Sequence, residues 1–140
     1  MCALRSHPFS EKRRLAVDNN TKFTFSQIRY IICLYRLSRN GQGVKNVELA
    51  VALGYSKPSV HNMLKSLSEL GIIRQEMFGL AFFTEEGRSI AKKYFLCYGY
   101  LEKKISEICG RGAASEKAIC GLLADMPGKK IDELYSEGGE

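Results

Sequence analysis

The sequence predicts a mainly α fold with a small β-hairpin, in which a winged helix-turn-helix is followed by further helices. Two observations support this prediction. Between residues 44 and 70, a glycine separates a short apolar helix from a longer amphipathic helix, which is typical of a helix-turn-helix. Two short β-prone runs, residues 72–75 and 80–83, come directly afterwards in the position of a wing.

One helix is expected before the helix-turn-helix. Residues 26–38 (SQIRYIICLYRLS) repeat apolar side chains at helical spacing, and Thr24 or Ser26 can serve as the N-cap. The glycines that follow in residues 39–43 end this helix and allow the chain to turn. The next helix is short, and its apolar face consists of Val47, Leu49, Ala50 and Leu53.

The second helix of the motif is expected to expose a polar face. It begins at Ser56 as N-cap, has Pro58 in its first turn and ends near Gly71. Its apolar residues recur at helical spacing: Val60, Met63, Leu64, Leu67 and Leu70. The residues left facing outward are Lys57, Ser59, His61, Asn62 and Lys65. Because such groups can reach phosphates and base edges in a major groove, this face predicts a DNA contact.

The part of the chain after the hairpin is expected to be helical. Thr84 caps a helix that continues to about Cys109, and its apolar stripe is wider than a small winged helix can cover. A break at residues 110–112 precedes a helix capped by Ser115, and Pro127-Gly128 separates that helix from an amphipathic stretch at 129–135. The uncovered stripe predicts a further packing partner for these helices.

Charge and motifs limit the function classes. Residues 1–93 contain 15 Lys/Arg and 7 Asp/Glu, a balance of +8, whereas residues 94–140 contain 6 and 8, a balance of −2. Positive charge gathered with the helix-turn-helix favours a polyanionic partner. No enzyme is expected, since the sequence has no nucleophile–base pair, no glycine-rich phosphate loop and no HExxH motif.

The cysteines and the apolar runs predict the compartment. The five cysteines form no C-x-x-C pair, and the first 20 residues lack the continuous apolar core of a signal peptide. The apolar runs are far shorter than the roughly 18 residues that a membrane-spanning helix needs. We therefore expect a cytoplasmic protein with reduced thiols and no membrane partner.

Three segments, YIICLYRLS, ELAVALGYSKPSVHNMLKSLSELGII and LAFFTEEGRSIAKK, resemble the metal-dependent repressors of the DtxR/MntR family. The resemblance extends over residues 23–134 and fits the short, two-domain branch of the family. It implies a homodimeric transcriptional repressor that binds a palindromic operator in double-stranded DNA. The implied parts are a winged helix-turn-helix DNA-binding domain (23–93) and a helical dimerisation and sensor domain (94–140). Before them, the composition of the chain, with EKRR at 11–14 and few apolar residues, predicts an N-terminal basic arm (1–22).

The resemblance also implies which residues contact DNA. The DNA-contacting stretch of the family falls on Ser56, Pro58, Ser59, His61 and Asn62. Lys57 and Lys65 are implied as phosphate contacts. The wing has no cation at its tip, residues 77–79, so its expected contribution is Arg74.

The family is activated by a divalent transition metal, Mn(II) or Fe(II), but most of the implied ligand positions carry other residues in this chain. These positions hold Arg29, Ile32, Tyr98, Leu123 and Ala124, and Cys120 is the ligand that remains. Glu102 and Glu116 match the ancillary metal site of the family. The metal is therefore implied by the resemblance alone.

Several interpretations follow from this departure. Arg29 can replace the charge of the metal by a fixed cation, or it can be a solvated surface residue. Glu102, Glu116 and Cys120, with Asp125 as a further ligand, can form an unconventional metal site. A winged helix that binds proteins without specific DNA binding also fits the sequence, as does a thiol sensor that uses Cys97, Cys109 or Cys120.

Overall fold

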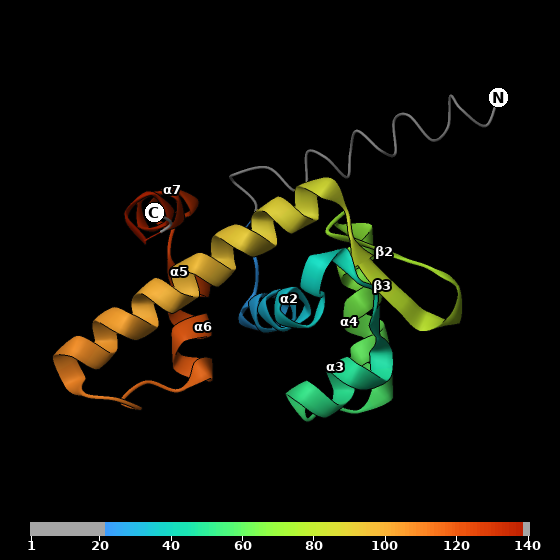
Figure 1. Ribbon diagram of the computed structural model, residues 1–140, viewed down its shortest axis with the longest axis horizontal. Helices are drawn as coiled ribbons and strands as arrows, with labels where there is room; N and C mark the ends of the chain where they lie inside the picture. The colour runs from blue at the N-terminus through green and yellow to red at the C-terminus, as the bar shows by residue number, and fades with distance from the viewer. Residues whose placement is uncertain (1–21, 139–140) are drawn as a thin grey trace.

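The computed structural model describes residues 22–138, so nearly all of the predicted basic arm lies outside the described residues. No helix between these limits is long and apolar enough to cross a membrane. The elements in chain order are α2 (Phe25–Leu37), η1 (Arg39–Gly41), β1 (Val44–Lys45), α3 (Asn46–Leu53), α4 (Lys57–Glu69), β2 (Ile73–Gln75), η2 (Met77–Gly79), β3 (Leu80–Phe83), α5 (Glu85–Cys109), α6 (Glu116–Asp125) and α7 (Gly128–Gly138). Figure 1 shows α2 in the middle, with the helix-turn-helix and the sheet on one side and α6 and α7 on the other.

The wing has one strand more than the sequence predicted. Strands β2 and β3 form the expected hairpin around η2, but β1 also pairs with β3, so the sheet has the order β1-β3-β2. All pairs are antiparallel, with Val44 opposite Ala81 and Arg74 opposite Phe82. Strand β1 was missed because two residues are too few to show a period of two. The predicted hairpin is therefore confirmed, and β1 extends it to a three-stranded sheet.

Side-chain caps determine where the helices begin. The Thr24 side chain accepts a hydrogen bond from the Gln27 backbone N–H at 3.1 Å, and the Gln27 side chain accepts one from the Thr24 N–H at 2.9 Å. Thr84 and Ser115 cap α5 and α6 in the predicted positions. Gly54 ends α3 in the left-handed conformation with φ at 73°, which glycine adopts without strain.

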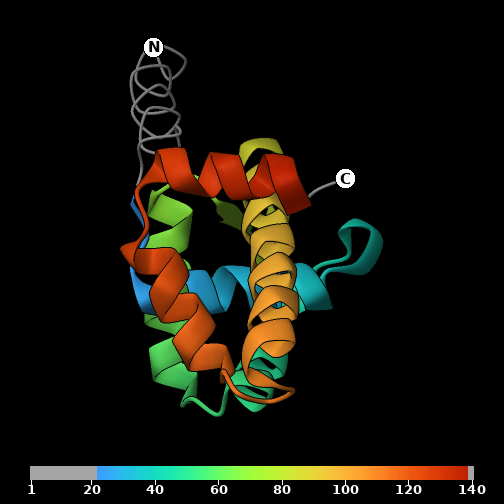
Figure 2. The same ribbon diagram turned by 90° about the vertical axis from the view of Figure 1, so that its left-hand side faces the viewer.

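The core is built around α2. Its apolar residues Ile28, Ile31, Ile32 and Leu34 each expose 2% or less of their surface. Helix α2 packs against α3 and α4 of the helix-turn-helix and against α5 and α6. In Figure 2, α2 crosses α5, and α7 lies across α5 at a different level. One central helix therefore connects the predicted DNA-binding part to the helices that follow it.

The apolar stripe of α5 is covered along most of its length. Ala91, Tyr94, Tyr98 and Leu101 are buried, whereas Ile108 near the end of the helix is 83% exposed. On α6, Ala118 is exposed and Leu122 is 41% exposed. The exposed large apolar side chains of these two helices are thus Ile108 near the end of α5 and Leu122 on α6.

Gly87 in the first turn of α5 lies where no side chain fits. A Cβ atom at this position would lie 1.8 Å from the backbone oxygen of Ile72. The approach is close because the Thr84 N–H donates to the same Ile72 oxygen at 3.0 Å, which holds the start of α5 against the end of α4 and β2. We expect Gly87→Ala to lower the free energy of unfolding by about 1–3 kcal/mol, as overpacking does. Urea denaturation measures this change.

Gly99 provides the matched control in the same helix. A Cβ atom at Gly99 would meet nothing within 4 Å. Gly99→Ala should therefore raise the free energy of unfolding by about 0.5–1 kcal/mol, the helix preference of alanine over glycine. Equal effects of the two substitutions would contradict the close packing of Gly87.

Candidate nucleic-acid interface

Helix α4 is fixed in orientation by its cap and its buried face. Ser56 accepts a hydrogen bond from the Ser59 backbone N–H at 3.3 Å, and its hydroxyl donates to the Ser59 hydroxyl at 2.9 Å. Val60, Leu64 and Leu67 are fully buried, and the predicted neighbours Met63 and Leu70 are half-buried. Rotation of α4 about its axis would expose these apolar side chains, so its opposite face is held outward.

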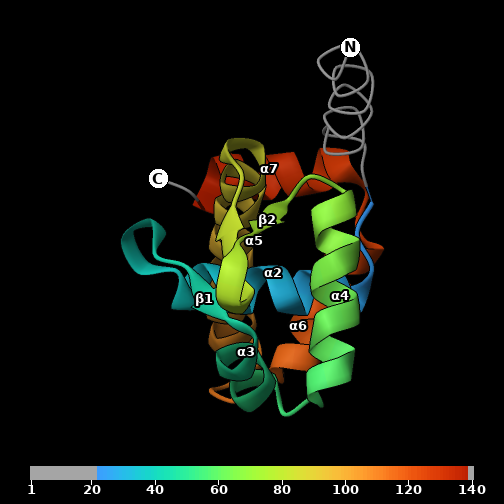
Figure 3. The same ribbon diagram turned by 90° about the vertical axis from the view of Figure 1, so that its right-hand side faces the viewer.

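The opposite face of α4 carries the predicted DNA contacts. Figure 3 shows α4 on the outside of the molecule, with α3 beside its N-terminal end. The structure leaves every predicted residue of this stretch exposed: Ser56, Lys57, Pro58, Ser59, His61, Asn62 and Lys65. Two ammonium groups, an imidazole, an amide and hydroxyls thus share one solvent-facing surface. Groups of this kind donate hydrogen bonds to phosphates and to base edges.

A groove of about 520 Å³ lies beside the start of α4. From α4 it is lined by Lys57, Pro58, His61 and Asn62. Its other wall is formed by Lys45, Asn46, Val47 and Gly79, which come from the start of α3 and from the wing. The sequence prediction missed these four residues, because the pairing of β1 with β3 places them beside α4. Val47 was expected on a buried face but is 45% exposed.

Asn46 is notable within this groove. Its side-chain Oδ1 atom is buried and has no hydrogen-bond partner among the described residues. A buried polar atom without a partner is costly, so it is usually satisfied by water or by a ligand. Lys45 therefore adds an exposed cation beside α4, and Asn46 adds an unsatisfied acceptor to the wall of the groove.

The Arg74 side chain of the wing contacts two neighbouring side chains. Its Nε atom lies 3.5 Å from Glu76 Oε1, and its guanidinium carbon lies 5.0 Å from the centre of the Phe82 ring. The side chain is still 57% exposed, so a phosphate can compete with Glu76 for it. The wing tip carries exposed Met77 and no cation, as the sequence indicated.

Arg29, at one of the implied metal-ligand positions, makes contacts with side chains from other elements. The Arg29 side chain on α2 is only 10% exposed, so it is not a solvated surface residue. Its Nε donates to Glu116 Oε1 on α6 at 3.2 Å, and its Nη1 donates to the Tyr55 hydroxyl between α3 and α4. Arg36 Nη1 lies 3.4 Å from the second oxygen of Glu116. We call Arg29, Tyr55, Glu116 and Arg36 the Arg29 brace, because it joins α2, α6 and the turn of the helix-turn-helix.

The residues present do not fit the divalent metal that the resemblance implies. Between residues 22 and 138, no three side chains of the His, Cys, Asp or Glu type gather closely enough to hold a metal ion. The proposed set of Glu102, Glu116 and Cys120 is therefore not assembled in the described structure. The physical reason is that Glu116 already faces two guanidinium groups, while the Cys120 thiol is fully buried.

The buried thiols are held in their neutral form. Burial raises the pKa of Cys97 and of Cys120 to about 11, and the Glu116 carboxylate adds to the increase for Cys120. Because the pKa of each thiol is higher in the folded state, its contribution to stability is fully present below the unfolded value of 9.0. That contribution is lost as the pH rises to about 11, the pKa of the folded state. We expect the free energy of unfolding to fall between these two pH values, as measured by urea denaturation. The fall in the free energy of unfolding with pH should be shallower in Cys120→Ala. An identical pH dependence in this variant would contradict the raised pKa of Cys120.

Comparisons with known proteins agree with this architecture. Residues 34–76, which contain α3, α4 and β2, match the IclR helix-turn-helix domain. No curated protein sequence matches the chain. The predicted helix-turn-helix is thus confirmed by a model of that motif.

Solved structures with the same fold include several regulators. IdeR from T. acidophilum has a TM-score of 0.59 at 15% identity, and the match covers 81% of this chain and 54% of that protein. ScaR with bound Zn²⁺ has a TM-score of 0.58 at 19% identity, with 79% and 52% covered. The manganese regulator SloR has a TM-score of 0.57 at 17% identity, with 79% and 53% covered.

A hypothetical protein from Sulfolobus solfataricus matches over more of its own length. Its TM-score is 0.55 at 19% identity, and the match covers 82% of this chain and 88% of that protein. The chain spans about half the length of IdeR, ScaR and SloR. The fold that the resemblance implied, a winged helix-turn-helix followed by helices, is confirmed.

Proposed function

We propose that this chain is a DNA-binding transcriptional regulator of the DtxR/MntR type, and a repressor by that resemblance. It acts as a homodimer on a palindromic operator, with α4 of each protomer in the major groove. The observation that carries the proposal is the exposed face of α4, where Lys57, His61, Asn62 and Lys65 lie together beside the groove with Lys45. The charge of +8 on residues 1–93 supports a polyanionic partner.

The proposal includes metal-independent binding. In the Arg29 brace, a guanidinium occupies the position where the resemblance implies a metal, and it contacts α6 and the turn of the helix-turn-helix together. The brace thus supplies a fixed positive charge that links α2 to α6 and to the turn of the helix-turn-helix. All contacts of the brace are between side chains of the chain itself, so we propose that DNA binding needs no metal ion.

Homodimerisation is proposed from exposed apolar side chains on α5 and α6. Ile108 and Leu122 are exposed apolar side chains there, at 83% and 41% of their surface. A second copy that covered them would place two α4 helices on one DNA duplex. Light scattering of the purified protein measures this, with twice the chain mass as the expected result.

Fluorescence anisotropy on DNA from upstream of the gene tests the proposal. Binding should weaken as salt rises, because each neutralised phosphate contributes about −0.9 to the slope of log affinity against log salt. A module that binds only proteins would not bind the DNA and would show no such slope. The absence of salt-dependent DNA binding would contradict the proposal.

Lys45 is one of the four groove residues that the sequence prediction missed, and its substitution tests their role. We expect Lys45→Ala to weaken binding to all DNA sequences and to reduce the salt slope by about one per protomer, as loss of a phosphate contact does. The measurement is a salt titration of the anisotropy signal. Lys104→Ala, which removes an exposed cation from α5 on another part of the molecule, is the control and should leave the slope unchanged.

A further inference from the structure

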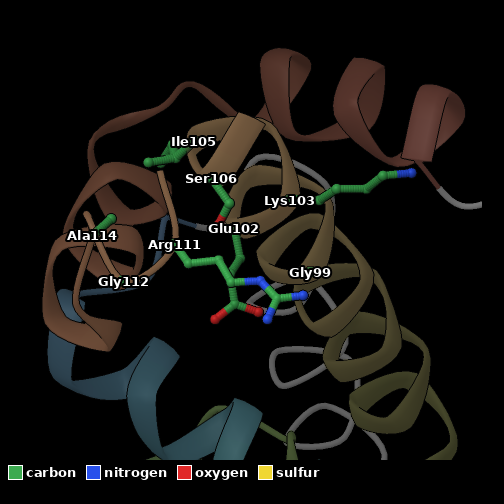
Figure 4. Close-up of a pocket in the computed structure, with 8 residues that line it drawn as sticks. All are labelled: Gly99, Glu102, Lys103, Ile105, Ser106, Arg111, Gly112 and Ala114. Carbon is green, nitrogen blue, oxygen red and sulfur yellow. The ribbon is translucent and has the colours of Figure 1, made fainter. Parts of the chain in front are cut away.

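Two opposite charges face one hollow beside α5. The hollow has a volume of about 360 Å³, and its walls are the stretch of α5 between residues 99 and 106 and the loop at 111–114. Figure 4 shows the Arg111 guanidinium and the Glu102 carboxylate extending to the same side of the hollow, whereas Lys103 extends away from them. Ser106 contributes a hydroxyl, and Ile105 and Ala114 contribute apolar surface.

These two charges are not paired with each other. None of the ion pairs within the described residues, all defined by a distance of 4.0 Å or less, includes Glu102 or Arg111. Opposite charges that line a common hollow while remaining apart match a ligand that carries both charges.

We propose that this hollow binds a small zwitterion, namely an amino acid with an aliphatic side chain. Arg111 donates hydrogen bonds to the carboxylate of the ligand, and Glu102 accepts them from its ammonium group. Ile105 and Ala114 then contact the aliphatic side chain. The volume of 360 Å³ lies at the small end of ligand sites, which range over about 300–1,000 Å³. Gly99 leaves the wall open, since a Cβ there would meet nothing within 4 Å.

The position of the hollow suggests a regulatory role, and this step rests on the proposed function. Ala114 lies two residues before Glu116, whose carboxylate pairs with Arg29. A ligand held by Arg111 and Ala114 would fix the loop that leads into α6 and so hold Glu116 in the Arg29 brace. Because the brace reaches Tyr55 in the helix-turn-helix, the bound amino acid should raise the affinity for DNA.

Isothermal titration calorimetry of the full chain with three probes tests the site. The probes are L-leucine, isoamylamine, which lacks the carboxylate, and 4-methylpentanoate, which lacks the ammonium group. We expect L-leucine to bind and each analogue to bind at least about tenfold more weakly, since each has lost a hydrogen-bonded charge. Arg111→Gln and Glu102→Gln should each weaken L-leucine binding by a similar factor, whereas Lys92→Gln on the same helix should not.

Specific results would overturn the inference. They are a failure of L-leucine to bind, equal binding of 4-methylpentanoate, or unchanged binding in Arg111→Gln. Gly99→Leu should fill the hollow and abolish L-leucine binding without changing the molecular mass in light scattering. If this variant becomes a monomer instead, a second copy of the chain occupies the hollow and the inference is wrong.

The DNA measurement separates the two proposals. Anisotropy with and without L-leucine should show tighter DNA binding in its presence. If DNA binds but L-leucine does not, the zwitterion site is refuted and the proposed function stands. If L-leucine binds but DNA does not, the proposed function is refuted and the site stands.

Discussion

Replacing Asn62 and Lys65 together with alanine is expected to reduce DNA affinity by about a hundredfold or more, because each protomer loses a base contact worth about 1–3 kcal/mol and the dimer loses it twice. Loss of Lys65 should remove the predicted phosphate contact in addition. Both side chains are exposed on α4, so the fold should remain intact. Fluorescence anisotropy measures the affinity, and light scattering measures the molecular mass.

The matched control is Lys129→Ala, which removes an exposed cation from α7. It should change DNA affinity little, since α7 packs on α5 and lies apart from the helix-turn-helix in Figure 1. If the double variant instead loses the dimer and keeps the affinity of each chain for DNA, the division into a DNA-binding part and a dimerisation part is wrong.

Glu116→Ala is expected to lower the free energy of unfolding by about 2 kcal/mol, because it leaves the buried Arg29 guanidinium without its carboxylate. The loss is smaller than for a fully buried pair, since the Glu116 side chain is 37% exposed. DNA affinity should fall as well, because Arg29 would no longer join α6 to the turn of the helix-turn-helix. Urea denaturation and anisotropy measure the two effects.

Two further variants make this prediction specific. Glu133→Ala removes a carboxylate from the exposed Lys130–Glu133 pair, whose side chains are 65% and 51% exposed, and should leave the free energy of unfolding nearly unchanged. Arg29→Met combined with Glu116→Ala should recover part of the lost stability, because no charge is then left unpaired in the interior. A double variant less stable than the sum of the single changes would contradict the role of Glu116 as the partner of Arg29.

Local signals predicted much of the fold. Thr84 and Ser115 cap their helices as the sequence indicated, and α5 ends at Cys109. For α2 the sequence left Thr24 or Ser26 open, and the structure has Thr24 as the N-cap. Ser56 and Pro58 likewise placed the start of α4. A cap depends on residues within three positions of each other, so it can be read from a short stretch of sequence.

Contacts between distant residues could not be predicted in the same way. Arg29 and Glu116 are 87 positions apart, and no local pattern brings them together. Lys45 and Asn46 reach the groove through the pairing of β1 with β3, which depends on the register of the whole sheet. The same limit applies to the hollow at Glu102 and Arg111, because the turn after α5 positions its second wall.

The central claim, DNA binding that needs no metal, is tested most directly by anisotropy on the upstream DNA in excess chelator. The titration is repeated with Mn(II) or Fe(II) added under reducing conditions. The Arg29 brace predicts the same salt-dependent affinity in both titrations, and it predicts weaker binding for Glu116→Ala in both. Binding that appears only after metal is added would contradict the account and would direct the search for ligands to Cys120 and the carboxylates around it.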